Sequence, residues 1–206
     1  MTGLINILLP PGKINLKIGL FFGSFNPIHI GHMAIANYLV EFSEINQLWF
    51  VVSPQNPFKK IENLLSDHHR LEMTMQAVND DPRFRVSDVE LHMSKPSYTI
   101  DTLKTLQNKF PTHQFALILG SDNLEGFSQW KNYETILENY EIMVYPRPGF
   151  DPSKFISHKN IRNVDAPMIE ISSSFIRDSI RNRKNMRFFL PQKVWEYMEE
   201  MQFYKK

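Results

Sequence analysis

The sequence predicts a Rossmann-like α/β fold: a doubly wound, mainly parallel sheet with helices on both faces and a small C-terminal helical portion. Two observations carry this prediction. Short apolar runs typical of buried strands alternate with segments of helical periodicity. In addition, 206 residues suit one domain, since domains have roughly 100–200 residues. We expect a single domain over residues 17–206, preceded by an N-terminal extension of residues 1–16.

The N-terminal half carries three predicted strands and two predicted helices. The turn signal Pro10–Gly12 ends the extension before the first strand. In the second helix, Asp67 is the expected N-cap, and Leu71, Met75 and Val78 form the apolar stripe expected to face the core. The strands are expected at Ile18–Phe22, Leu48–Val52 and Phe84–Val89, and the helices at Ile30–Phe42 and Asp67–Val78.

The C-terminal half continues the alternation of strands and helices. A helix is expected from Ser97 or Thr99 to Phe110, with one of these two hydroxyls as its cap. Ligands of such sheets bind at the carboxyl ends of strands beside a topological switch point, so the loops after these strands are the places to search. The remaining strands are expected at Phe115–Leu119 and Glu141–Tyr145, and the last helices near Ser174–Arg181 and Pro191–Phe203.

The composition excludes several function classes. The chain has no cysteine, which excludes disulfides, thiol catalysis and thiolate metal sites. Its net charge of +1 argues against extensive nonspecific binding of nucleic acid. No stretch approaches the roughly 20 apolar residues of a membrane span, and no signal peptide is evident. We therefore expect a cytoplasmic protein without nucleic-acid or membrane partners, and the sequence does not indicate an oligomeric state.

The loop after the first strand, Gly23–His32, combines residues suited to bind an anion. It lies between a buried strand and a helix, where backbone amides and the helix dipole favour phosphate. His29 and His32 are one helical turn apart and can face the same phosphate. The alternatives are histidines with a purely structural role, or a zinc site. No third ligand motif lies nearby, which disfavours the metal.

This loop resembles the signature of the nucleotidyltransferase superfamily that shares its H-x-G-H element with class I aminoacyl-tRNA synthetases. The matching pattern is G-x-F-x-P-x-H-x-G-H. The resemblance implies that His29 and His32 contact ATP phosphates and stabilise charge as pyrophosphate leaves. It also implies that the ATP site includes Gly23, Ser24, Phe25 and Gly31.

Two further segments are similar to the bacterial nicotinate-nucleotide adenylyltransferase family. Ser97–Leu103 implies that Tyr98 and Thr99 contact the acceptor nucleotide. Leu119–Asp122, followed by Trp130, implies that Trp130 stacks on the pyridine ring, although Trp130 as a core anchor is the alternative. The role of Lys131 is open. The same resemblance places Gly120 and Asp122 near the ATP ribose.

A third segment, Ile171–Arg177, is similar to the family's S-S-T-x-I-R, with Ser174 in place of the usual threonine. It implies that Ser173, Ser174 and Arg177 bind the β- and γ-phosphates of ATP, against the alternative of a simple helix cap. Pro54–Lys59 is a looser match, because the family more often has Pro-Pro-His-Lys there. Lys59 is carried over as a substrate contact.

The resemblance implies adenylyl transfer from ATP to nicotinate mononucleotide, giving deamido-NAD and pyrophosphate, a step of NAD biosynthesis. The acceptor phosphate is already anionic, so no general base is required and positioning and charge stabilisation dominate. His29, His32 and Arg177 are the expected catalytic residues, and Mg²⁺ is expected to bind through the ATP phosphates without a protein metal site. The alternatives are adenylyl or cytidylyl transfer to another phosphorylated acceptor, and a non-catalytic nucleotide sensor.

Overall fold

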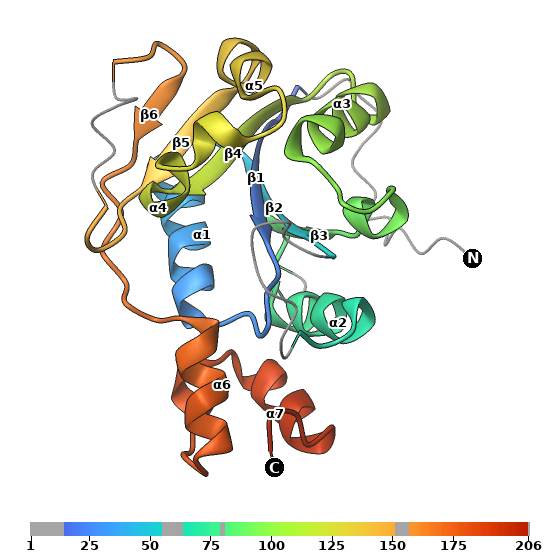
Figure 1. Ribbon diagram of the computed structural model, residues 1–206, viewed down its shortest axis with the longest axis vertical. Helices are drawn as coiled ribbons and strands as arrows, with labels where there is room; N and C mark the ends of the chain where they lie inside the picture. Colours follow the sequence, from blue (N-terminus) through green and yellow to red (C-terminus); the bar gives the residue numbers. More distant parts are fainter. Residues whose placement is uncertain (1–14, 55–63, 79–80, 151–156, 206) are drawn as a thin grey trace.

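The computed structural model describes residues 15–54, 64–78, 81–150 and 157–205. Within these ranges, six strands form one parallel sheet (Figure 1). Its order is β3-β2-β1-β4-β5-β6. The strands are β1 (Lys17–Gly23), β2 (Gln47–Val52), β3 (Phe84–Ser87), β4 (Gln114–Gly120), β5 (Glu141–Tyr145) and β6 (Ile161–Asn163). The predicted fold class is confirmed.

The sheet order reverses between β1 and β4. The chain builds outward from β1 to β3 on one side, then returns to the other side of β1 and continues to β6. Leu20 of β1 is therefore paired with both Trp49 of β2 and Leu117 of β4. The loops after β1 and β4 leave neighbouring strands in divergent directions, which opens a switch point at the carboxyl edge of the sheet.

Helices cover both faces of the sheet, and each face has its own apolar core. This double cover explains why every residue of β2 is buried and why the strand shows no polar alternation. One face carries α1 (Ile30–Phe42), α2 (Asp67–Val78), α6 (Ser173–Arg181) and α7 (Gln192–Glu200), and the other carries α3 (Thr99–Lys109), α4 (Ser121–Leu124) and α5 (Tyr133–Asn139). Three short 3₁₀ helices are η1 (Val89–His92), η2 (Phe127–Gln129) and η3 (Arg187–Phe189).

Helix α2 has the predicted bounds, but its predicted N-cap is wrong. Asp67 is its first residue, and the preceding Ser66 accepts a hydrogen bond from the amide of His69 at Oγ (3.5 Å). The predicted apolar stripe is half-buried, and its residues Leu71 and Val78 pack against the core. The fully buried residues of the helix are Arg70, Met73 and Thr74. Periodicity counts apolar residues, so it misses a face built around a hydrogen-bonded arginine.

Other elements differ at their ends. The third strand stops at Ser87, and the chain continues as η1. The last helix ends at Glu200, and the short strand β6 was not predicted. The expected hydroxyl cap of α3 is wrong, because Tyr98 is the N-cap and makes no side-chain cap bond. The Ser97 hydroxyl donates instead to Glu90 Oε2 (3.2 Å).

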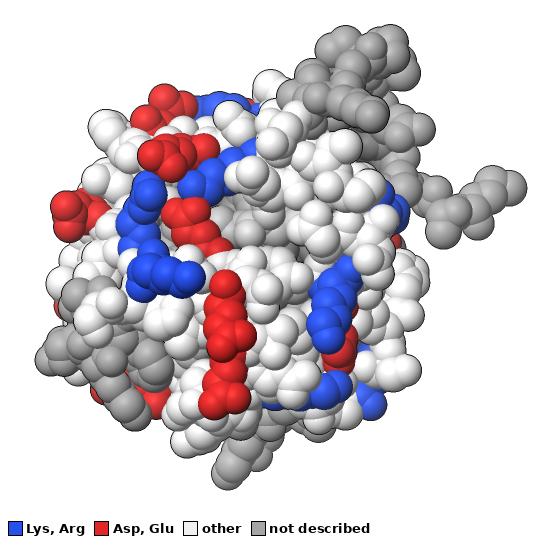
Figure 2. All heavy atoms as spheres, turned by 90° about the horizontal axis from the view of Figure 1, so that it is seen from above, with Lys and Arg blue, Asp and Glu red and all other residues white. Residues whose placement is uncertain are grey.

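The opposite, amino edge of the sheet carries a network of ion pairs. Lys17 is paired with Glu141 (2.6 Å) and Glu44 (3.2 Å), and Arg162 contacts the same two carboxylates at 3.4 Å. Figure 2 looks onto this end and shows side chains of both signs interspersed, without a large patch of one sign. No helix in the described ranges is long and apolar enough to cross a membrane.

Candidate active site

The two histidines of the first loop stack on each other at the switch point. His29 is the N-cap of α1 and is 2% exposed, and His32 lies one turn further along. Their ring centroids are 3.7 Å apart and the ring planes differ by 26°. The predicted side-by-side arrangement therefore exists, with both imidazoles at the start of a helix where the dipole favours an anion.

A backbone hydrogen bond fixes the tautomer of His32. The amide of His29 donates to Nδ1 of His32 at 3.2 Å. A backbone amide can only donate, so this nitrogen carries no proton and a neutral His32 holds its proton on Nε2. His32 therefore offers an N–H donor on the side of its ring away from the loop backbone.

Burial keeps His29 neutral. Desolvation, with a smaller contribution from the positive charge of Arg147, lowers the pKa of His29 to about 3. Its Nδ1 is buried and has no hydrogen-bond partner among the described residues. Buried polar atoms are normally paired, and an orphan at a loop–helix junction is a candidate for contact with a ligand.

A recess opens in front of these rings, which we call the histidine recess. It spans about 260 Å³, open solvent included, and lies between α1, the end of β5 and the segment before α6. Only about 10 Å³ of it has room for the centre of a water molecule, so a nucleotide would lie mostly outside it, along the switch point. The lining residues are Phe21, His29, Gly31, His32, Ile35, Tyr145, Pro146, Arg147, Ile169 and Ile171.

Arg147 supplies the positive charge of the histidine recess. Its backbone amide donates to Ser121 Oγ (2.8 Å), and its Nη2 donates to the Tyr145 hydroxyl (3.3 Å). Its Nε is buried without a partner in the described part of the chain. The Arg147–Gly149 segment also fits the family pattern, but an ordinary turn is the alternative, so the predicted site residues did not include Arg147. Only the neighbouring position of β4 and β5 brings it to the edge occupied by His29.

Two glycines at the site leave little room for a side chain. A Cβ on Gly120 would lie 2.3 Å from Asp122 Oδ1 and 3.1 Å from Arg147 Cγ. A Cβ on Gly31 would lie 3.0 Å from His29 Nδ1. Both predicted positions therefore keep the backbone close to the functional side chains. Asp122 itself is exposed, beyond the end of β4.

The first residues of the loop serve chiefly to shape it. Gly23 accepts a hydrogen bond from the amide of Ser53 (2.9 Å), and the carbonyl of Ser24 accepts one from Arg70 (2.6 Å). The ring of Phe25 is 2% exposed and lies edge-on to His32, with centroids 5.2 Å apart.

The start of α6 docks onto the same loop across nearly 150 residues of sequence. Ser173 Oγ donates to the carbonyl of Pro27 (2.8 Å). Arg177 Nη1 donates to the carbonyl of Asn26 (2.8 Å) and Nη2 to Ser174 Oγ (3.1 Å). The three residues predicted to bind the β- and γ-phosphates therefore lie together beside the first loop. Two of the N–H groups of Arg177 already donate to protein oxygens.

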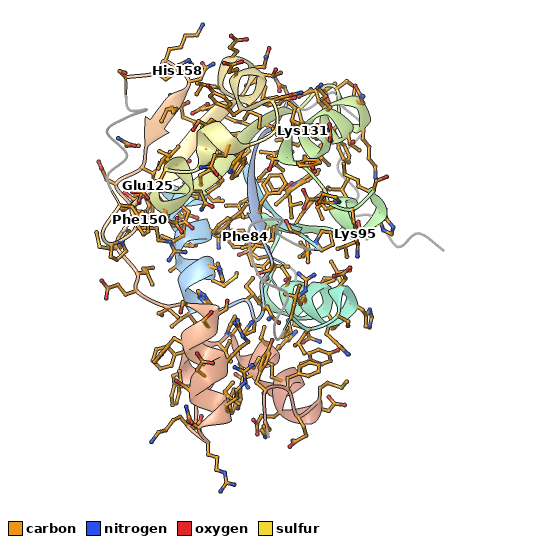
Figure 3. The ribbon with its side chains drawn as sticks, in the orientation of Figure 1. Phe84, Lys95, Glu125, Lys131, Phe150 and His158 are labelled. Atoms are coloured by element: carbon orange, nitrogen blue, oxygen red, sulfur yellow. The ribbon has the colours of Figure 1, made fainter. Side chains whose placement is uncertain are left out.

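The predicted acceptor residues lie on the other face of the sheet, at the start of α3. Tyr98 is 37% exposed. Lys131 Nζ lies 4.6 Å from the centre of the Tyr98 ring and 2.8 Å from Asp101 Oδ2, and Figure 3 shows Lys131 beside α3. Trp130 is half-buried and packs at 5.4 Å against Phe127, so part of its surface serves the core. Lys59 lies outside the described residues.

A buried carboxylate that the sequence prediction missed supports this segment. Glu90 is 2% exposed and accepts hydrogen bonds from Ser97 Oγ (3.2 Å) and Thr102 Oγ1 (2.7 Å). These two residues flank Tyr98 and Thr99, so Glu90 fixes the backbone around them. In the sequence, only the hydroxyls of Ser97 and Thr102 point to a buried carboxylate, and they do not identify Glu90 as that carboxylate.

The chain is similar to known proteins over most of its length. Residues 20–179 match the family model described as cytidylyltransferase-like. The chain is 50% identical over 193 residues to the probable nicotinate-nucleotide adenylyltransferase of Flavobacterium psychrophilum, covering 93% of this chain and 100% of that protein. It is 47% identical over 185 residues to the protein of the same name from Bacteroides thetaiotaomicron, covering 90% and 92%.

Two solved structures share the fold. One is the Plasmodium falciparum nicotinic acid mononucleotide adenylyltransferase complexed with NaAD, with a TM-score of 0.77, 22% identity and coverage of 92% of this chain and 98% of that one. The other is a putative nicotinate-nucleotide adenylyltransferase from Vibrio parahaemolyticus, with a TM-score of 0.69, 20% identity and coverage of 92% and 95%.

Proposed function

The chain belongs to the nicotinate-nucleotide adenylyltransferase family within the cytidylyltransferase-like group, and from this premise we propose that it transfers the adenylyl group of ATP to nicotinate mononucleotide. The products are deamido-NAD and pyrophosphate. The single observation that carries the proposal is the stacked His29–His32 pair facing Arg147 at the switch point. Imidazole N–H donors and the cation Arg147 in a partly enclosed recess suit a phosphate chain.

In the proposed reaction, an oxygen of the acceptor's phosphate attacks the α-phosphorus of ATP. The bond from that phosphorus to the oxygen bridging it to the β-phosphorus breaks, and the electron pair leaves with pyrophosphate. The attacking oxygen is already anionic, so no residue need remove a proton. The protein's task is to align both substrates and to stabilise the negative charge that develops on the leaving group.

The two histidines are proposed to donate hydrogen bonds to the α-phosphate and the bridging oxygen. His32 is suited to this because the amide of His29 holds its Nδ1, which places the proton of a neutral imidazole on Nε2. A preorganised donor needs no reorientation when charge develops, so its contribution is realised in the transition state. His29 is neutral and buried, and it would donate one hydrogen bond without adding a charge.

The start of α6 is proposed to bind the β- and γ-phosphates. Arg177 and Ser174 are bonded to each other, and Ser173 fixes the helix to the loop that holds the histidines. Mg²⁺ is proposed to enter as part of the MgATP substrate. The described lining of the histidine recess offers nitrogen donors and a tyrosine hydroxyl but no carboxylate, whereas Mg²⁺ prefers oxygen ligands.

Nicotinate mononucleotide is proposed to bind at the start of α3, between Tyr98, Thr99 and Trp130. The exposed Tyr98 precedes a helix of 11 residues, whose first amides favour a carboxylate. Lys131, which is paired with Asp101, lies beside the Tyr98 ring. Gly120 and Asp122 lie at the end of β4, which is between β1 and β5 in the sheet, and the ATP ribose is proposed to bind there.

The experiment that tests the proposed function is pyrophosphate release with ATP and a panel of acceptors. Nicotinate mononucleotide should support release at least tenfold faster than phosphopantetheine or glycerol phosphate. Release with one of those acceptors and none with nicotinate mononucleotide would assign another transferase activity. Tight ATP binding without release for any acceptor would assign the non-catalytic sensor.

A further inference from the structure

A second hollow lies at the far end of α6, between the turn after this helix and α7. It encloses about 820 Å³, open solvent at its mouth included, and is larger than the histidine recess. Its lining includes Arg181, Arg183, Lys184, Lys205 and Trp195, and we call it the basic groove. Since α6 has nine residues at about 1.5 Å each, the two hollows are separated by the helix length, roughly 13 Å.

The positive charge of the basic groove comes from two side chains. Arg181 is paired with Asp178 (2.8 Å), and Lys205 with Glu199 (3.0 Å). Arg183 and Lys184 are exposed, and neither forms an ion pair with a carboxylate in the described part of the chain. These two adjacent cations are therefore available to a ligand, and the ligand they favour is an anion.

The backbone at Arg183 and Lys184 forms a helix-ending motif in which glycine and an apolar residue are more usual at these two positions. The amide of Arg183 donates to the carbonyl of Ile180 (2.8 Å) and that of Lys184 to the carbonyl of Ser179 (2.9 Å), the pattern of a Schellman motif. Arg183 has φ 59°, where glycine is favoured. The next position often carries an apolar residue in this motif but is Lys184 here. Folding alone does not account for a cation at both positions.

The dipole of α6 offers a simpler reason for basic residues at this end. It explains Arg181, which is in the last turn and already satisfied by Asp178. It does not explain why the strained position should carry a long side chain, since glycine there would relieve the strain and leave Arg181 and Lys184 in place. Strained positions that keep a costly residue are enriched at functional sites.

An aromatic side chain completes the groove. Trp195 of α7 is half-buried and forms part of the lining next to the cations. An indole offers a flat surface on which a nucleobase can stack. We propose that the basic groove binds a chain of two or more phosphates, either free or as part of a nucleotide, through Arg183 and Lys184, with Trp195 beside any attached base. This site is separate from the proposed catalytic one.

The test follows the indole signal of Trp195 by NMR during titration with tripolyphosphate and, separately, with ATP. The chain has three tryptophans, so Trp195→Phe assigns the signal. The test variant is Arg183→Ser with Lys184→Ser. The matched control is Lys104→Ser with Lys159→Ser, which removes two exposed cations elsewhere. Adenylyl transfer, measured in parallel, should be within twofold of wild type in both variants.

The expected result is a saturable shift of the Trp195 signal, with affinity at least tenfold weaker in the test variant and unchanged in the control. Similar affinities for both probes would identify the phosphate chain as the ligand, and tighter binding of ATP would identify a nucleotide. A shift that persists in the test variant would mean that the signal arises at the catalytic site, and it would overturn the proposal. The absence of any shift in the wild-type protein would also overturn it. The NMR readout does not depend on turnover. If the protein did not catalyse the proposed adenylyl transfer, the result of this titration could therefore still be interpreted.

Discussion

Arg70 Nη1 donates to the carbonyl of Ser24 at 2.6 Å and to the carbonyl of Ser53 at 2.7 Å. One fully buried side chain therefore ties the loop after β1 to the loop after β2. Its other donors bond to Leu65, Pro54 and Asp67, so each guanidinium nitrogen has a partner. Burial lowers the pKa of Arg70, but a guanidinium stays charged at neutral pH.

Replacing Arg70 should destabilise the fold strongly. Arg70→Met would leave several carbonyls of the two loops without their donor and take one of the two cationic partners from Asp67, which keeps Lys95, and this costs about 3 kcal/mol or more of unfolding free energy. Urea denaturation of wild type and variant gives this value. Arg187→Met, at an exposed position, is the matched control and should cost less than about 0.5 kcal/mol. Equal stability of the two variants would show that the buried hydrogen bonds of Arg70 contribute nothing.

His29 should make stability depend on pH in a defined direction. Its folded-state pKa, about 3, lies below its unfolded value of 6.5, so between these values the unfolded chain binds a proton that the folded chain does not. The stabilisation is therefore present above pH 6.5 and is lost as the pH falls, by about 1.4 kcal/mol per unit. His29→Gln should remove this slope between pH 6 and 4.5, whereas the exposed-site control His92→Gln should keep it.

Gly120→Ala should impair catalysis through geometry. The added methyl group would overlap Asp122 Oδ1 and press on Arg147 and Tyr145, at 3.1 and 3.2 Å. Displacement of Arg147 should lower kcat/KM for ATP by about tenfold, because small misplacements at a site of this kind are costly. Gly126→Ala is the matched control, since no atom lies within 4 Å of its Cβ position. Equal values of kcat/KM for the two variants would show that the site does not require a glycine at position 120.

Replacing Glu90 should weaken binding of the acceptor nucleotide and leave binding of ATP unchanged. Glu90→Ala would release the hydroxyls of Ser97 and Thr102 and loosen the segment around Tyr98. We expect KM for nicotinate mononucleotide to rise at least tenfold while KM for ATP changes less than twofold. Glu90→Gln keeps an acceptor oxygen and should restore most of the affinity. A parallel rise in both KM values would indicate general destabilisation instead.

The sequence was sufficient to predict the fold class, most strand and helix positions and the grouping of the site segments. Apolar runs and periodicity are local signals, and the first loop and its neighbours are recognisable as motifs. The contributions of Arg70, Glu90 and Arg147 were not predictable in this way. Arg70 bonds to carbonyls 16 or more residues away, Glu90 to hydroxyls 7 and 12 residues further along the chain, and Arg147 reaches the site through strand order, and a local pattern shows none of these pairings. For the same reason, periodicity on α2 found half-buried apolar residues but not the arginine at the centre of the buried face.

The central claim concerns His32, and one measurement tests it most directly: the steady-state rate of pyrophosphate release from ATP and nicotinate mononucleotide by wild type and His32→Ala. Loss of one preorganised donor should lower kcat by about 100-fold or more. KM for both substrates should change little, because the donor acts mainly in the transition state. Thermal unfolding of the variant checks that the fold is intact. A folded variant with a kcat close to that of wild type would contradict the account.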